Sequence, residues 1–199
     1  MNYPVLSRAV PYAKAQAEAH GKRVEFNLTT NATLLTTKMI EFLAEEDISV
    51  TVSIDGPRDM QNRFRVFHDG SGSYDVMLPR VRELLQRHRS RPIGARVTLT
   101  SQVNDILGIY QHLTEEIGFQ EVGFAPVTTS PGRDHALDGS GFDQMVTQFK
   151  ALADEFLRAA LAGQHHGFSN VSETLGEIHK GVSKAYPCGA GLGLIGVAT

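Results

Sequence analysis

The chain has 199 residues, 41% of them hydrophobic and 21% charged, which is the composition of a domain that folds around a buried core. With 19 basic and 22 acidic residues its formal charge is −3, so no global electrostatic attraction to nucleic acid or anionic membranes is expected. Its single cysteine, Cys188, excludes an internal disulfide and favours a cytoplasmic location, and no segment approaches the roughly 18 apolar residues that a membrane helix requires.

Apolar residues alternate along the chain between short β-type runs and longer helical periods. The first expected elements are a helix from residue 3 to Gly21 with Pro11 inside it, a strand over 23–28 followed by a loop over 29–31, and a helix from about Thr36. A strand over 48–54, a polar connection, a helix capped by Ser73 and a strand over 93–99 follow. The last elements are a helix that ends at Gly118, a strand over 121–127, a long helix before Gly163, and a helix over 169–182. The strand over 48–54 is short and rich in β-branched residues, as is typical of a strand buried on both faces.

Strands that alternate with helices in this way cross over right-handedly and lie parallel. The sequence therefore predicts an α/β fold, and the simple succession of units favours an arc of a TIM-like barrel. An open doubly wound sheet has the same local pattern and differs in strand order, so it stays the alternative. In both folds ligands bind at the carboxyl ends of the strands.

Polar residues follow the expected strands at that edge. Thr30 and Asn31 come after the first strand, Ser53 and Asp55 end the second, and Thr100 follows the third. The alternation of side chains along a strand puts Ser53 and Asp55 on one side, where they could bind the hydroxyl groups of a ligand. Turn formation by the Asp-Gly-Pro and Thr-Thr-Asn segments explains the same residues without a ligand.

Two further sets of side chains have both a functional and a structural interpretation. One of Arg58, Arg63 and Arg65 could fold over the strand ends and hold a carboxylate through both branches of its guanidinium, although solvated arginines are commoner. The pair His165–His166 lacks nearby ligands for a metal and is interpreted as part of a solvated helix face.

Four segments in chain order carry a family resemblance: FNLTTNATLL, VSIDGPRDMQNRFRVFHDGSGSYD, RVTLT and YPCGAGLGLIGVAT. Together they resemble radical S-adenosylmethionine (AdoMet) enzymes with a SPASM extension, in particular peptide and protein maturases such as the anaerobic sulfatase-maturating enzymes. The resemblance implies a partial (β/α)6 barrel, with the strands of this chain as its third to sixth. It further implies that residues 1–186 form the barrel core and its C-terminal helices, and that residues 187–199 begin the SPASM region.

The family's CxxxCxxC loop and Gly-Gly-Glu-Pro segment are not in this sequence. We therefore expect a barrel that is truncated at both ends. The strand over 23–28 would then have lost its neighbour, so self-association through its open edge is expected.

The resemblance also implies roles for residues at the strand ends. Thr30 and Asn31 would line the cofactor side of the barrel. Ser53 would contact the ribose of AdoMet, and Asp55 would shape the same strand end. Arg65 matches an arginine that reaches the carboxylate of the cofactor in relatives.

Two positions bear on how far these roles can be carried over. The His-Asp pair that usually precedes the matched arginine is replaced by Gln61-Asn62, which puts the local hydrogen bonding in question. Cys188 matches the first cysteine of the SPASM region, a ligand of an auxiliary [4Fe-4S] cluster. The partner cysteines of that cluster are not in the sequence, so the chain is not expected to assemble it alone.

These features predict the barrel core of a radical AdoMet enzyme that abstracts a hydrogen from a peptide or protein side chain with a 5′-deoxyadenosyl radical. Without clustered cysteines to bind the [4Fe-4S] cluster, the chain alone is expected to be inactive. The alternative is a non-catalytic module that binds AdoMet or a nucleoside, or that docks on a partner. A sugar- or phosphate-handling enzyme is a third hypothesis, which needs an acid or base among Asp55, Asp105 and Glu121.

Overall fold

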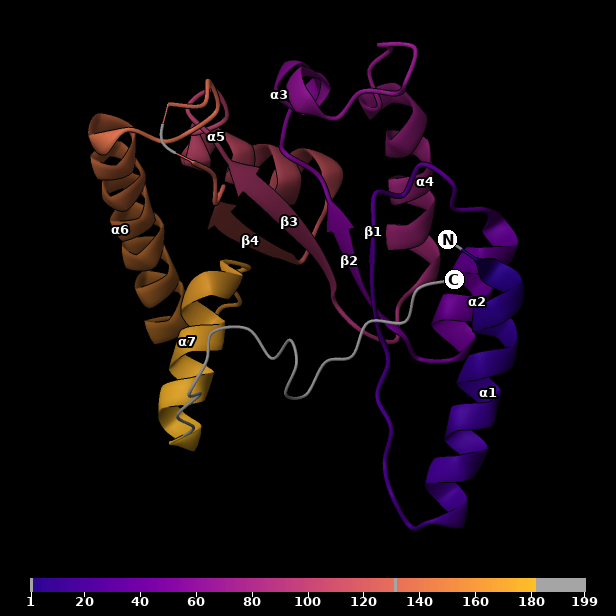
Figure 1. Cartoon of the computed structure of the whole chain (residues 1–199). Helices are drawn as coiled ribbons and strands as arrows, with labels where there is room; N and C mark the ends of the chain where they lie inside the picture. The colour runs from indigo at the N-terminus through magenta and orange to yellow at the C-terminus, as the bar shows by residue number, and fades with distance from the viewer. Residues whose placement is uncertain (1, 131, 182–199) are drawn as a thin grey trace.

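A computed structural model describes residues 2–130 and 132–181, which form a four-stranded parallel sheet with helices along one side (Figure 1). The elements are α1 (Tyr3–Ala19), β1 (Asn27–Thr30), α2 (Thr37–Glu45), β2 (Ser49–Ser53), α3 (Arg58–Phe64), α4 (Tyr74–Arg87), β3 (Ile93–Leu99), α5 (Ile106–Gln111), the π-helical turn η1 (His112–Ile117), β4 (Glu121–Pro126), α6 (Gly139–Leu161) and α7 (Ser169–Lys180). No helix in these described ranges is long and apolar enough to cross a membrane.

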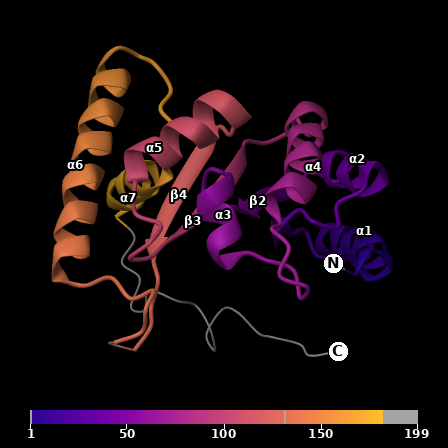
Figure 2. The same ribbon diagram turned by 90° about the horizontal axis from the view of Figure 1, so that it is seen from above.

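The strand order decides between the two folds that the sequence allows. The strands lie in the order β1-β2-β3-β4, and every neighbouring pair is parallel. Seen from above, helices α1, α2, α4, α5 and α6 follow one another round the sheet (Figure 2). A consecutive order is that of a barrel arc, whereas a doubly wound sheet reverses direction at a switch point. The predicted α/β fold and partial barrel are therefore confirmed.

The two faces of the sheet differ in polarity and burial. Along β2, Val50 and Val52 are buried against the helices, whereas Ser49, Thr51 and Ser53 are only half-buried. The prediction that this strand is buried on both faces is wrong, because its alternating sequence puts the valines on one face and the hydroxyl side chains on the other. By register, the polar face, here called the open face, comprises Asn27, Thr29, Ser49, Thr51, Ser53, Gly94, Arg96, Thr98, Glu121, Gly123 and Ala125.

Most helix and strand boundaries agree with the sequence patterns, with three exceptions. β1 begins at Asn27 rather than at residue 23, and it includes Thr29 and Thr30 because both pair in register with β2. The polar connection after β2 contains the short helix α3. Ser73 precedes α4 without capping it, because its hydroxyl accepts a hydrogen bond from Gln61 instead.

The outer edge of β4 is covered by the segment that enters α7. The amide of Val122 donates to the carbonyl of Gly167 at 2.8 Å. The side chain of Asn170 accepts from the Phe124 amide at 2.8 Å and donates to the Phe124 carbonyl at 2.9 Å, as a neighbouring strand would. At the other end of the sheet, no strand in the described residues pairs with the free edge of β1. Association of chains through that edge stays a prediction.

His166 lies in a packed cluster rather than on a solvated helix face, so that interpretation is wrong. The residue belongs to the connection between α6 and α7, where its ring stacks on Tyr110 with the ring centroids 5.0 Å apart. Its edge meets Phe156, and its Nε2 lies 3.9 Å from a carboxylate oxygen of Glu155. Burial raises the pKa of Tyr110 to about 12. Burial also lowers the pKa of His166 below its ordinary value of 6.5, against the opposing effect of Glu155.

This lowered pKa predicts a pH-dependent stability. The unfolded chain binds the His166 proton more readily than the folded chain, so the free energy of unfolding should fall as the pH drops below about 6.5. The variant His166→Phe should lose that part of the pH dependence, whereas removal of the exposed His179 should leave it in place. Urea unfolding at about pH 5.5 and about pH 7.5 measures the difference. If the free energy of unfolding falls equally between the two pH values in the unsubstituted chain and in His166→Phe, the prediction is contradicted.

Candidate functional site

Asp55 lies at the carboxyl end of β2 and is held by an ion pair that closes over the strand ends. Its Oδ2 accepts a hydrogen bond from Nε of Arg65 at 2.6 Å, and its Oδ1 accepts from Nη2 of Arg65 at 2.9 Å. The Thr98 amide also donates to Oδ1, at 3.0 Å. The side chain of Asp55 is 5% exposed and that of Arg65 is 29% exposed, so the carboxylate is buried and the guanidinium still reaches solvent. The pair fixes the connection after β2 onto β3.

The replacement Gln61-Asn62 preserves a hydrogen-bond network at this connection. Gln61 is 1% exposed; its Oε1 accepts from the Asp55 amide at 2.8 Å and its Nε2 donates to Ser73 Oγ at 3.0 Å. Asn62 Oδ1 accepts from the Tyr74 amide at 3.0 Å. Gln61 and Asn62 therefore supply hydrogen bonds at the position where the departure from the family pattern put them in question.

The end of β1 shows both turn chemistry and a cavity. Thr30 Oγ1 accepts from the Ala32 amide at 3.1 Å, and Asn31 Oδ1 accepts from the Thr33 amide at 3.2 Å, as expected for turn-forming residues. Beside this turn is a cavity of about 220 Å³. Its lining comprises Asn31, Thr33, Gln61, Arg65, Val66, Phe67 and Ser73.

The structure brings some of the predicted site residues together and separates others. Asn31 and Arg65 line one cavity, and Ser53 lies on the open face of the adjacent strand. Thr30 is in register with the buried Val52, which puts it on the helix side of the sheet, and Thr29 takes the place on the open face. Cys188 and the predicted boundary at residues 186–187 lie outside the described residues, so both stay predictions.

Sequence reasoning missed one charged residue on the open face. Arg96 lies in the middle of β3, where the apolar run 93–99 drew attention to the strand rather than to its one cation. It is exposed, and it is in register with Ser53 on β2. A charged side chain in the centre of a parallel strand was the signal that could have revealed it.

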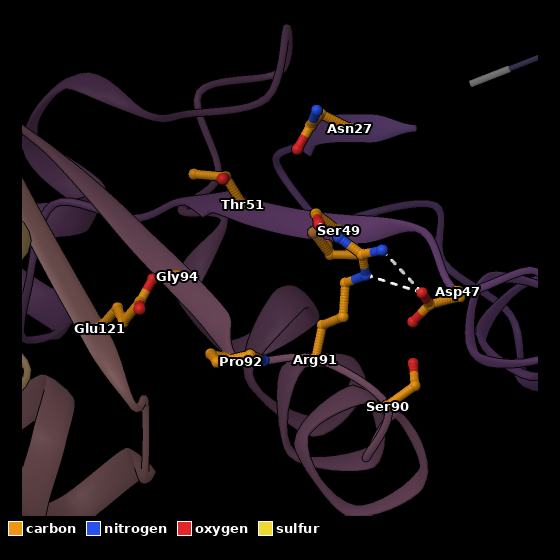
Figure 3. Close-up of a pocket in the computed structure, with 10 residues that line it drawn as sticks. Asn27, Asp47, Ser49, Thr51, Ser90, Arg91, Pro92, Gly94 and Glu121 are labelled. Atoms are coloured by element: carbon orange, nitrogen blue, oxygen red, sulfur yellow. Dashed lines mark hydrogen bonds and ion pairs between the residues drawn. The ribbon is translucent and has the colours of Figure 1, made fainter. Parts of the chain in front are cut away.

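A second cavity opens at the opposite, amino ends of the strands. It measures about 570 Å³ and is bordered by an ion pair in which Nη2 of Arg91 lies 2.7 Å from Oδ2 of Asp47 (Figure 3). The hydrogen bond from Arg91 lowers the pKa of Asp47. Glu121 points into the same space from β4. Because ligands of parallel α/β folds bind at the carboxyl ends of the strands, the candidate ligand site is the one at the other end of the sheet.

The candidate acids and bases of the third hypothesis do not form one site. Asp55 is paired with Arg65, and Asp105 caps α5 by accepting from the Gly108 amide at 3.2 Å. Glu121 lies at the amino end of its strand. Within residues 2–130 and 132–181, no group of three or more His, Cys, Asp and Glu side chains could hold a metal ion.

Comparison with known proteins shows what the chain is similar to. No family model matches it. A serine-type anaerobic sulfatase-maturating enzyme of Bacteroides thetaiotaomicron is 30% identical over 147 residues, which are 69% of this chain and 34% of that protein. The chain is a relative of the anaerobic sulfatase-maturating enzymes. The resemblance to radical AdoMet maturases drawn from the four motifs is thereby confirmed.

Solved structures agree on the fold. The chain matches native anSMEcpe with bound AdoMet and the Kp18Cys peptide with a TM-score of 0.72 and 19% identity, over 92% of this chain and 52% of that one. The structure with AdoMet and the Cp18Cys peptide gives a TM-score of 0.71 and 19% identity, over 86% and 48% of the two chains. The chain thus spans about a third of the length of the curated relative and about half of these solved chains.

Proposed function

We propose that this chain forms the part of a radical AdoMet enzyme barrel that positions AdoMet and a peptide or protein substrate. One observation carries the proposal: Ser53 ends the open face on β2, and Asn31 and Arg65 line a cavity beside the end of the adjacent strand β1, on a fold that matches structures solved with AdoMet. The hydrogen abstraction from a side chain and the peptide substrate belong to the proposal, as does a cytoplasmic location.

The described residues fit AdoMet better than they fit an iron–sulfur cluster. Ser53 has no side-chain hydrogen bond to any described residue, and Nη1 of Arg65 is likewise unused, so both can donate to a ligand. No group of metal-binding side chains lies within the described ranges, so we assign no step to a cluster held there. AdoMet reduced by such a cluster supplies the 5′-deoxyadenosyl radical in this family.

The chain's own residues then have binding and positioning roles. Ser53 would bind a ribose hydroxyl and Arg65 the carboxylate of AdoMet, while Asp55 holds the Arg65 guanidinium in place through two hydrogen bonds. Holding cofactor and substrate in one geometry lowers the entropic part of the barrier to hydrogen transfer. A second candidate is a non-catalytic module that binds AdoMet, which would use the same unpaired donors of Ser53 and Arg65.

Isothermal titration of the chain with AdoMet tests the assigned site. Loss of one neutral hydrogen bond costs about 1 kcal/mol, so Ser53→Ala should weaken AdoMet binding about fivefold. The matched control is Ser49→Ala, which removes the same hydroxyl from the other end of β2 on the same face. An equal loss of AdoMet affinity in both variants, or no loss of affinity in Ser53→Ala, would count against the site.

A further inference from the structure

Arg96 is a cation without a partner on the open face. It is exposed, and its guanidinium makes no hydrogen bond or ion pair with any residue in the described ranges. The other arginines near the strand ends differ in this respect. Arg65 is paired with Asp55, and Arg63 donates to Gln102 at 3.0 Å. The guanidinium of Arg96 is therefore free for a ligand.

Glycines on the neighbouring strands leave room for two oppositely charged side chains to lie along the sheet without forming an ion pair with each other. Arg96 on β3 faces Gly123 on β4, and its Nη1 lies 3.3 Å from where a Cβ on that glycine would be. Glu121 on β4 faces Gly94 on β3, and its Oε2 lies 4.0 Å from the corresponding point there (Figure 3). The two side chains form no ion pair with each other. The open face thus presents a free cation next to a free anion that lies nearer the amino ends.

The position of Arg96 separates it from the groups proposed for the cofactor. Ser53 is its neighbour in register on β2, whereas Asn31 and Arg65 line the cavity beside the end of β1. Arg96 lies on the opposite side of Ser53, toward β4. A cofactor bound by Asn31, Ser53 and Arg65 therefore leaves Arg96 to a second ligand beside it.

We propose that Arg96 binds a carboxylate of the peptide substrate. This inference rests on the proposed function, in which the second ligand is a peptide. At neutral pH the groups of an unmodified peptide that are predominantly anionic are its carboxylates, and the planar fork of a guanidinium matches a carboxylate through two parallel hydrogen bonds. The negative charge of Glu121 would repel a second acidic group nearer the amino ends of the strands. The site therefore selects a single carboxylate beside Ser53.

The test compares two peptides that differ in one charge, acetyl-Gly-Glu-Gly-amide and acetyl-Gly-Gln-Gly-amide, by NMR titration of the whole chain. The acidic peptide should bind more tightly, and Arg96→Gln should weaken its binding about tenfold without changing that of the Gln peptide. Arg89→Gln removes the same charge from an exposed position after α4 and should change neither. Glu121→Gln should strengthen binding of the acidic peptide.

The remaining outcomes are also decisive. Equal binding of both peptides, or equal losses in Arg96→Gln and Arg89→Gln, would overturn the proposal. A second pair of probes, AdoMet and 5′-methylthioadenosine, which lacks the carboxylate, tests the cofactor as the source of the anion. If Arg96→Gln weakens only AdoMet, the substrate assignment is wrong. If AdoMet does not bind but the peptide discrimination persists, the proposed function fails while the carboxylate site stands.

Discussion

The variant Arg65→Ala should lower the free energy of unfolding by about 3 kcal/mol, at the low end for a broken buried pair because Arg65 is itself partly exposed. Its partner Asp55 has a side chain that is 5% exposed and would be left with only the Thr98 amide as a donor. A buried carboxylate without its counter-charge is costly, whereas the removed guanidinium was partly solvated. Urea unfolding monitored by circular dichroism measures the loss.

Two controls separate this effect from general damage to the connection. Arg58→Ala removes an arginine from an ion pair whose side chains are 62% and 56% exposed, and it should cost less than about 1 kcal/mol. Asp55→Asn combined with Arg65→Ala should be more stable than Arg65→Ala alone, because the uncompensated charge is then gone. A loss for Arg65→Ala no larger than that for Arg58→Ala would show that the Asp55 pair contributes little.

The variant Phe168→Ala should cost about 4 kcal/mol, the usual range for a buried phenylalanine truncated to alanine. Phe168 is fully buried, and its ring meets those of Phe124 and Phe149 edge to face, with centroids 6.2 Å and 5.4 Å away. It therefore joins α6 to β4 beside the covered edge of the sheet. The midpoints of thermal and of urea unfolding should both move to lower values.

Phe142 provides the matched control for this prediction. It is a phenylalanine of α6 that is 52% exposed, so Phe142→Ala should change stability by less than about 0.5 kcal/mol. Amide hydrogen exchange at Val122 and Phe124 gives a second readout, because loss of Phe168 should loosen the segment that covers their amides. Similar unfolding curves for the two alanine variants would refute the prediction.

Much of the fold follows from the period of the apolar residues. The strand expected over 93–99 is β3 without a change of boundary, and the helix end expected at Gly118 is formed by its left-handed φ of 98°. The sequence puts the start of β1 too early because Val24 and Phe26 continue an apolar pattern, whereas the register with β2 begins at Asn27. The local sequence pattern indicates which residues are apolar, but the hydrogen bonds to the neighbouring strand determine where a strand begins.

The sequence selects residues for the candidate site without predicting how they lie relative to one another. Asp55 and Arg65 were both selected, yet their mutual ion pair depends on how α3 turns the connection back over the sheet, which no local pattern encodes. The open face was missed for a related reason. The hydroxyl residues Ser49, Thr51 and Ser53 are compatible with a buried strand until the strand order shows which side the helices occupy.

Within the described residues, the outer edge of β4 has no free amide left for a further strand. On the outer side of β4 the amides of Val122 and Phe124 are already bonded, and the next residue that would donate on that side is Pro126, which has no amide hydrogen. Of the two sheet edges that the described residues form, the one that a strand of another chain could join is therefore that of β1. Contacts through β1 alone are isologous and use up the free edge of each chain, so pairing of this kind ends at two chains and cannot propagate into a fibre.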